Sequence, residues 1–146
     1  MELLSSIERV DLNWSDSGDF IIQNGDIKDT RLNKGEGFIE EVTRRIKSSV
    51  GDWKLEPSFG ASLGTFEGEN NIEETWKRIE SSLSHALTYD LFLYPRAFEI
   101  NIAPIDSDEI AIRVDFTPEL DILLGTELPT VKMVYSLSSH QPFIMR

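Results

Sequence analysis

Few residues of this chain combine in a pattern that could do chemistry. The sequence has two histidines and no cysteine, which excludes disulfides, thiolate catalysis and cysteine-based zinc sites. His85 stands alone within a helical pattern, where a structural role is commoner than a catalytic one, and His140 lies in the C-terminal tail. The motifs of hydrolase elbows, phosphate loops, dinucleotide-binding turns and zinc-binding helices are missing from the sequence. The sequence therefore predicts a non-enzyme with no cofactor and no metal.

The acidic residues are numerous but do not form a recognisable ligand set. Asp106-Ser107-Asp108-Glu109 lacks the twelve-residue pattern of a calcium loop, and a turn between two alternating apolar runs explains it better. The net charge of −12 and the pI near 4.5 argue against nucleic acid and anionic membranes as partners. The same charge would attract a basic face of a protein partner.

The elements that would position these residues follow from periodicity. Residues 34–50 and 71–89 carry apolar residues at helical spacing, and Asn71 with Glu74 fits a capping box. Asn24-Gly25 predicts a hairpin with strands near residues 19–23 and 26–30. Later strands are expected over the following ranges: 98–102, 110–116 and 131–137. We expect one α+β domain of 146 residues, with two central helices packed on an antiparallel sheet.

Other stretches are less clear. Residues 1–17 fit either a short helix or an N-terminal arm that becomes ordered only on a partner, and they do not resemble a signal peptide. The conformation of residues 118–129 is left open. No apolar run approaches the roughly 20 residues of a membrane span.

A central loop, residues 51–64, separates the two predicted helices. Gly51 is expected to cap the first helix, and Pro57 keeps the residue before it extended. Four large apolar residues indicate that the loop is partly packed: Trp53, Leu55, Phe59 and Leu63. We interpret it as an ordered connector that displays Asp52, Lys54 and Glu56. The alternative is a plain connection whose aromatic residues cap the core and whose charges are solvated.

The order Gly51-Asp52-Trp53, then Leu55-Glu56-Pro57 and Gly60, resembles the gene 25-like family of baseplate wedge proteins. That family occurs in contractile phage tails, type VI secretion systems and related contractile injection machines. Gly25-Asp26-Ile27 and Asp29 resemble the family's opening, so the likeness covers about residues 18–90. Ser58 stands where the best-known family members carry arginine, and no role of that arginine carries over.

The resemblance implies a structural subunit that links the baseplate to the first sheath ring and initiates sheath assembly. Its partners would be other wedge proteins and the tail sheath protein, with the tail tube as a further candidate. It would lie in the virion tail baseplate and be assembled in the host cytoplasm. By the same resemblance, the central loop lies at or beside an interface through Asp52, Trp53, Glu56 and Pro57.

The resemblance also assigns a role to the C-terminal strand and tail, residues 130–146. Residues 131–137 are expected to form a sheet edge to which arms of the sheath protein add strands. The alternating residues of that strand share one face: Val131, Met133, Tyr135 and Leu137. The alternative is an internal strand followed by a frayed tail.

Two other functions remain open. Some members of the resembled family are labelled lysozymes, and a peptidoglycan-degrading glycoside hydrolase needs two carboxylates roughly 5 to 9 Å apart. Glu56 with Asp52 or Glu67 would be the candidate pair. The last alternative is an unrelated soluble acidic adaptor.

Overall fold

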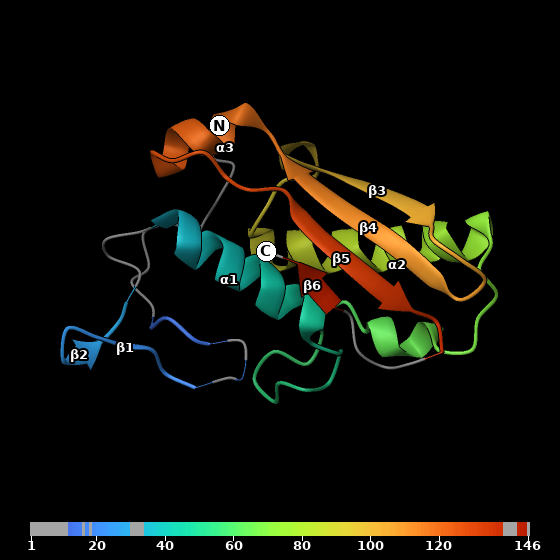
Figure 1. Cartoon of the computed structure of the whole chain (residues 1–146), viewed down its shortest axis with the longest axis horizontal. Helices are drawn as coiled ribbons and strands as arrows, with labels where there is room; N and C mark the ends of the chain where they lie inside the picture. The colour runs from blue at the N-terminus through green and yellow to red at the C-terminus, as the bar shows by residue number, and fades with distance from the viewer. Residues whose placement is uncertain (1–11, 16, 18, 30–33, 139–142, 146) are drawn as a thin grey trace.

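The computed structural model describes residues 12–15, 17, 19–29, 34–138 and 143–145. In this part of the chain, two long helices lie against one face of a four-stranded antiparallel sheet (Figure 1). The predicted α+β architecture is confirmed. Most of the expected N-terminal arm lies outside the described residues. Among the described residues, each helix is too short or too polar to span a lipid bilayer.

The first described element is a small hairpin formed by β1 (Ile22–Gln23) and β2 (Asp26–Ile27). Asn24 and Gly25 both have positive φ, at 53° and 79°, as a type I′ turn requires. The hairpin predicted from Asn24-Gly25 is therefore confirmed, although its strands are shorter than expected.

The helices α1 (Lys34–Lys47) and α2 (Glu73–Thr88) bury the apolar stripes expected from their sequences. Phe38, Val42 and Ile46 of α1 meet the core, which α2 enters through buried residues that include Ile79, Leu83 and Leu87. Short 3-10 turns lie nearby: η1 (Leu63–Phe66), η2 (Tyr89–Leu91) and η3 (Pro95–Ala97).

Both predicted helix caps are wrong. Helix α1 ends at Lys47, before Gly51, and the hydroxyl of Ser48 donates to the carbonyl oxygen of Arg44 at the helix end. Asn71 does not cap α2, whose N-cap is Ile72. The side-chain amide of Asn71 instead donates to the carbonyl oxygen of Asp106, so Asn71 connects the start of α2 to the turn after β3.

The four-stranded sheet has the order β3 (Phe98–Pro104), β4 (Glu109–Phe116), β5 (Val131–Ser136) and β6 (Phe143–Met145). Ile102, Ile112 and Met133 are aligned across three strands on the face that packs on the helices. Between β4 and β5, part of the stretch whose conformation the sequence left open forms α3 (Pro118–Leu124). Gly125, with a φ of 69°, is the C-cap residue of this helix.

The strand at residues 131–137 is internal, so the expectation that it forms the sheet edge is wrong. Lys132, Met133 and Val134 pair with Met145, Ile144 and Phe143 of β6. No sequence pattern indicated β6, because three consecutive apolar residues are too few to show a period. In the described sheet, β3 and β6 are the edges.

Candidate functional site

The central loop exposes the four residues that the sequence marked as an interface. Asp52, Trp53, Glu56 and Pro57 are all exposed, within an exposed run from residue 50 to residue 58. Leu55, between them, is 97% exposed, and Trp53 is 46% exposed. The loop therefore brings two carboxylates and large apolar side chains together at one surface.

The backbone of the loop is closed by its own hydrogen bonds. The N–H of Gly51 donates to the carbonyl oxygen of Pro57 at 2.9 Å, and that of Phe59 donates to the carbonyl oxygen of Glu56 at 3.1 Å. The carboxylate of Asp52 accepts the N–H of Ser49 at 2.8 Å. These bonds connect the two ends of the loop and hold its first residues against the segment that follows α1.

Phe59 anchors the loop to the helices. It is only 2% exposed, and the guanidinium carbon of Arg45 lies 5.0 Å from its ring centre. Tyr89 also meets Phe59 edge to face at a centroid distance of 6.0 Å. Such contacts between an aromatic ring and a cation or a second ring contribute on the order of 1 kcal/mol each.

Arg45 is a buried charge with a full set of partners. Its Nη1 donates to the carbonyl oxygens of Ala86 and Tyr89 at 3.1 and 2.8 Å, and its Nε donates to Glu41 at 2.8 Å. Its guanidinium carbon also lies 4.3 Å from the ring centre of Phe92. Burial lowers the pKa of Arg45, and the charge of Glu41 opposes that shift. Because arginine is a very strong base, Arg45 remains charged and joins α1 to the end of α2.

Trp53 is held in place while about half of its surface faces solvent. Its ring meets Phe59 edge to face at 6.2 Å, and the guanidinium carbon of Arg44 lies 5.7 Å from its centre. Its indole N–H donates to the hydroxyl of Ser48 at 3.3 Å. A side chain already held in one rotamer loses less entropy when a partner binds it.

The C-terminal candidates do not join this surface. Val131, Met133, Tyr135 and Leu137 are all buried and face the helices. The Tyr135 hydroxyl donates to the carbonyl oxygen of Leu63 in η1, and burial raises its pKa. The prediction that these four side chains bind a partner is wrong for this arrangement, because they form the core side of an internal strand.

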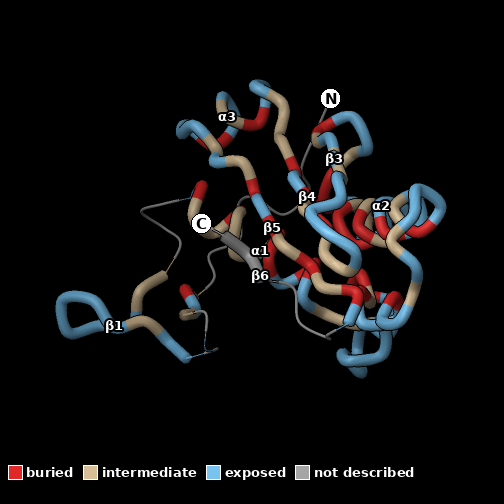
Figure 2. The backbone as a smooth tube through the Cα atoms, turned by 45° about the vertical axis from the view of Figure 1, so that its right-hand side comes forward, coloured by how far each residue is buried: buried red, intermediate tan, exposed pale blue. Residues whose placement is uncertain are grey.

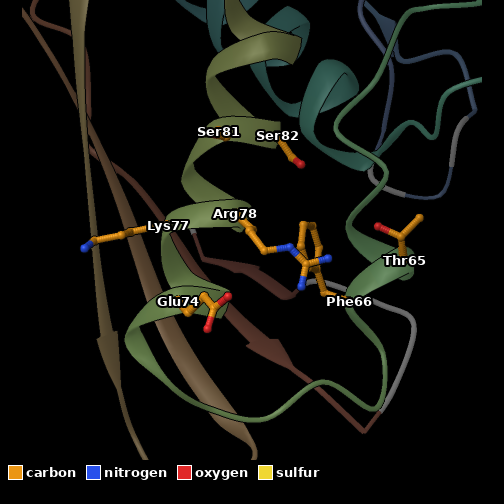
Figure 3. A pocket seen from close by; sticks show the side chains of 7 residues that line it. All are labelled: Thr65, Phe66, Glu74, Lys77, Arg78, Ser81 and Ser82. Atoms are coloured by element: carbon orange, nitrogen blue, oxygen red, sulfur yellow. The ribbon is translucent and has the colours of Figure 1, made fainter.

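None of the candidate hydrolase carboxylates, Asp52, Glu56 and Glu67, lines the hollow beside α2 and η1. That hollow is lined by the residues that Figure 3 labels: Thr65, Phe66, Glu74, Lys77, Arg78, Ser81 and Ser82. Glu74 is the one carboxylate of this lining, and Lys77 points away from the other side chains. Arg78 extends over Phe66 at 5.3 Å and pairs with Glu69 at 3.1 Å.

Among the described residues, no group of three or more His, Asp or Glu side chains could hold a metal ion. His85 has a structural contact, since its Nε2 lies 3.0 Å from the carbonyl oxygen of Ser58 at the base of the loop.

Sequence reasoning missed the residues that hold Phe59 of the loop in place. Arg45 and Tyr89 contact its ring, and Phe92 contacts Arg45. One signal was present: Arg45 lies three residues after Val42 and one before Ile46, so it borders the apolar stripe of α1. An arginine at that position faces the core and needs buried partners.

Comparison with known proteins gave no match at a significant level among protein-family models, curated proteins or solved structures.

Proposed function

We propose that this chain is a structural wedge subunit of the baseplate of a contractile phage tail or related injection machine. It links the baseplate to the first sheath ring and initiates sheath assembly in the host cytoplasm. Two things support the proposal: the resemblance over residues 18–90, and the central loop, which carries the motif residues.

The observation that carries the proposal is an exposed loop held in one conformation. Hydrogen bonds close its backbone, Phe59 anchors it, and Trp53 and Leu55 stay exposed. Exposed apolar side chains on a flexible loop would lose much entropy on binding, whereas a held loop loses little. Glu56 adds an acceptor for an arginine or lysine of a neighbouring wedge protein.

Charge reversal tests the loop. We expect Glu56→Arg to prevent incorporation of the chain into baseplates in an infection-complementation assay, because it places like charges against a basic partner. Glu80→Arg is the matched control, since Glu80 is an exposed residue of α2 outside the loop. Baseplates that incorporate both variants equally well would contradict the proposal.

The sheath would add its strand at β6 rather than at β5. An edge strand offers unpaired N–H and C=O groups, and β6 is the edge that the C-terminal segment forms. Deleting residues 130–146 would remove β5 and its buried residues, so it would test folding rather than function.

A shorter deletion separates an effect on folding from an effect on sheath assembly. Removal of residues 143–146 takes away β6 and leaves β3, β4, β5 and both long helices. We expect this chain to fold, as measured by circular dichroism, and to enter baseplates that do not nucleate sheath. Normal sheath on baseplates that contain the folded, shortened chain would rule out β6 as the attachment site.

A further inference from the structure

The N-terminal hairpin exposes a second apolar surface that the proposed wedge role of the central loop does not use. Its members are two aromatic and two isoleucine side chains, which we call the hairpin patch: Trp14, Phe20, Ile22 and Ile27. Ile22 is 68% exposed and Phe20 is 49% exposed. Figure 2 shows this part of the chain as a mostly exposed projection set apart from the buried core.

The pairing of the hairpin places the four side chains on one face. Ile22 lies directly opposite Ile27, and Trp14 lies opposite Phe20 with ring centres 4.4 Å apart. Phe20 and Ile22 are two residues apart in extended chain, so their side chains point the same way. The patch is therefore continuous along the hairpin.

The opposite face of the hairpin is fastened to α1. The amide of Asn13, which is fully buried, donates to Glu40 at 2.9 Å. The ammonium of Lys28 donates to both carboxylate oxygens of Glu36 at 2.8 Å. Two such contacts, one turn of helix apart, fix which face of the hairpin is turned outward.

The charges around the patch indicate what kind of partner covers it. Asp19 and Asp26 are exposed beside the patch. Among the described residues of the hairpin, the lysine is Lys28, and it faces Glu36 of α1. The whole chain carries a net charge of −12, so a second copy would be repelled. An apolar surface with an anionic rim is complementary to a segment that alternates apolar and basic side chains.

We propose that the hairpin patch is a docking surface for a basic, amphipathic segment of a different protein. The apolar side chains of that segment cover Trp14, Phe20, Ile22 and Ile27, and its lysines or arginines face Asp19 and Asp26. This binding does not depend on the baseplate role, because the patch lies on the hairpin and outside the central loop.

A synthetic peptide of about ten residues that alternates lysine and leucine serves as the probe. The full chain is labelled with ¹⁵N, and the indole N–H signal of Trp14, assigned with Trp14→Phe, reports binding. We expect the peptide to shift this signal. Peptides that alternate glutamate with leucine, or lysine with serine, should bind at least about tenfold more weakly.

Variants of the full chain locate the site. Phe20→Ser/Ile22→Ser changes only exposed side chains and should raise the Kd at least about tenfold. Asp19→Asn/Asp26→Asn should raise it several-fold and reduce its salt dependence. Leu55→Ser is the control: Leu55 is an exposed apolar residue of the central loop, and the Kd should stay within about twofold.

Three results would overturn the proposal. The first is a Trp14 signal that the lysine–leucine peptide does not shift. The second is a lysine–serine peptide that binds as tightly as the lysine–leucine peptide, which would mean that charge alone causes the binding. The third is a dimer of this chain in sedimentation equilibrium that Phe20→Ser/Ile22→Ser abolishes, since a second copy would then be the occupant. Backbone spectra of each variant that match those of the parent chain show that the hairpin is still folded.

Discussion

At the scale of single residues, Gly60 joins the central loop to the end of α1 by direct backbone contact. Its φ is 118°, a value that side-chain-bearing residues rarely adopt. A Cβ at this position would lie 2.5 Å from the carbonyl oxygen of Ser48, which belongs to the backbone and cannot move aside alone. Both facts make glycine a requirement here.

We therefore expect Gly60→Ala to lower the free energy of unfolding by at least about 2 kcal/mol, measured by urea denaturation. Gly64→Ala is the control, because a Cβ there would meet nothing within 4 Å. Its effect should stay within about 0.5 kcal/mol. Similar losses for the two variants would show that the close approach of Gly60 to Ser48 is unimportant.

Arg45 is the second residue on which the loop depends. Arg45→Met would leave the carbonyl oxygens of Ala86 and Tyr89 without this donor, and we expect a loss of roughly 2 to 4 kcal/mol in urea denaturation. Arg44→Met is the matched control, because Arg44 is exposed and its ion pair with Glu41 lies at the surface. Its cost should be below about 1 kcal/mol. An equally large loss for Arg44→Met would contradict this account.

At the scale of elements, Asp115 near the end of β4 connects to the start of β5. Its carboxylate accepts the Nε–H of Arg113 at 2.7 Å and the hydroxyl of Thr130 at 2.8 Å. These hydrogen bonds, that of Arg113 first, hold the pKa of Asp115 below its ordinary value of 3.8. The folded state therefore favours the ionised form more than the unfolded chain does.

The sign of the pH dependence follows. Stability from a lowered pKa is present above pH 3.8 and is lost as pH falls through the folded pKa. We expect Asp115→Asn to be less stable than the parent chain at pH 7 and the difference to shrink below about pH 4. Urea denaturation between pH 3 and pH 7 measures it. A difference that stays constant over this range would show that the carboxylate charge makes no contribution.

At the scale of the whole molecule, stability should differ between the core and the hairpin. Strand β4 pairs on both sides and buries Ile110, Ile112 and Val114, whereas β1 and β2 have two residues each and are exposed. Segments with few buried side chains and few paired strands open at a lower free energy than core strands do.

Hydrogen exchange measures this difference. We expect the amides of Ile112 and Val114 to exchange only with global unfolding, and those of Ile27 and Lys28 to exchange on the order of a hundredfold faster. Equal protection in the two regions would mean that the hairpin opens only when the core does.

The sequence alone determined the elements whose signals are local. The spacing of Phe38, Val42 and Ile46 predicts α1, because residues three and four apart share a helix face. The alternation of Ile110, Ile112 and Val114 predicts a strand with one buried face. In the central loop, the expectation that the large apolar residues are packed is correct for Phe59 and Leu63 and wrong for Leu55, which is 97% exposed, because residue type alone does not record which side chains a neighbouring element covers.

Only the tertiary structure decided the order of strands and the partners of buried charges. Whether residues 131–137 are edge or interior depends on β6, and the periodicity of a strand is the same in either place. Arg45 reaches Ala86 and Tyr89 across more than 40 positions, a pairing that no local pattern encodes. Periodicity records which face of an element is buried, whereas the element that buries it is selected by packing between distant parts of the chain.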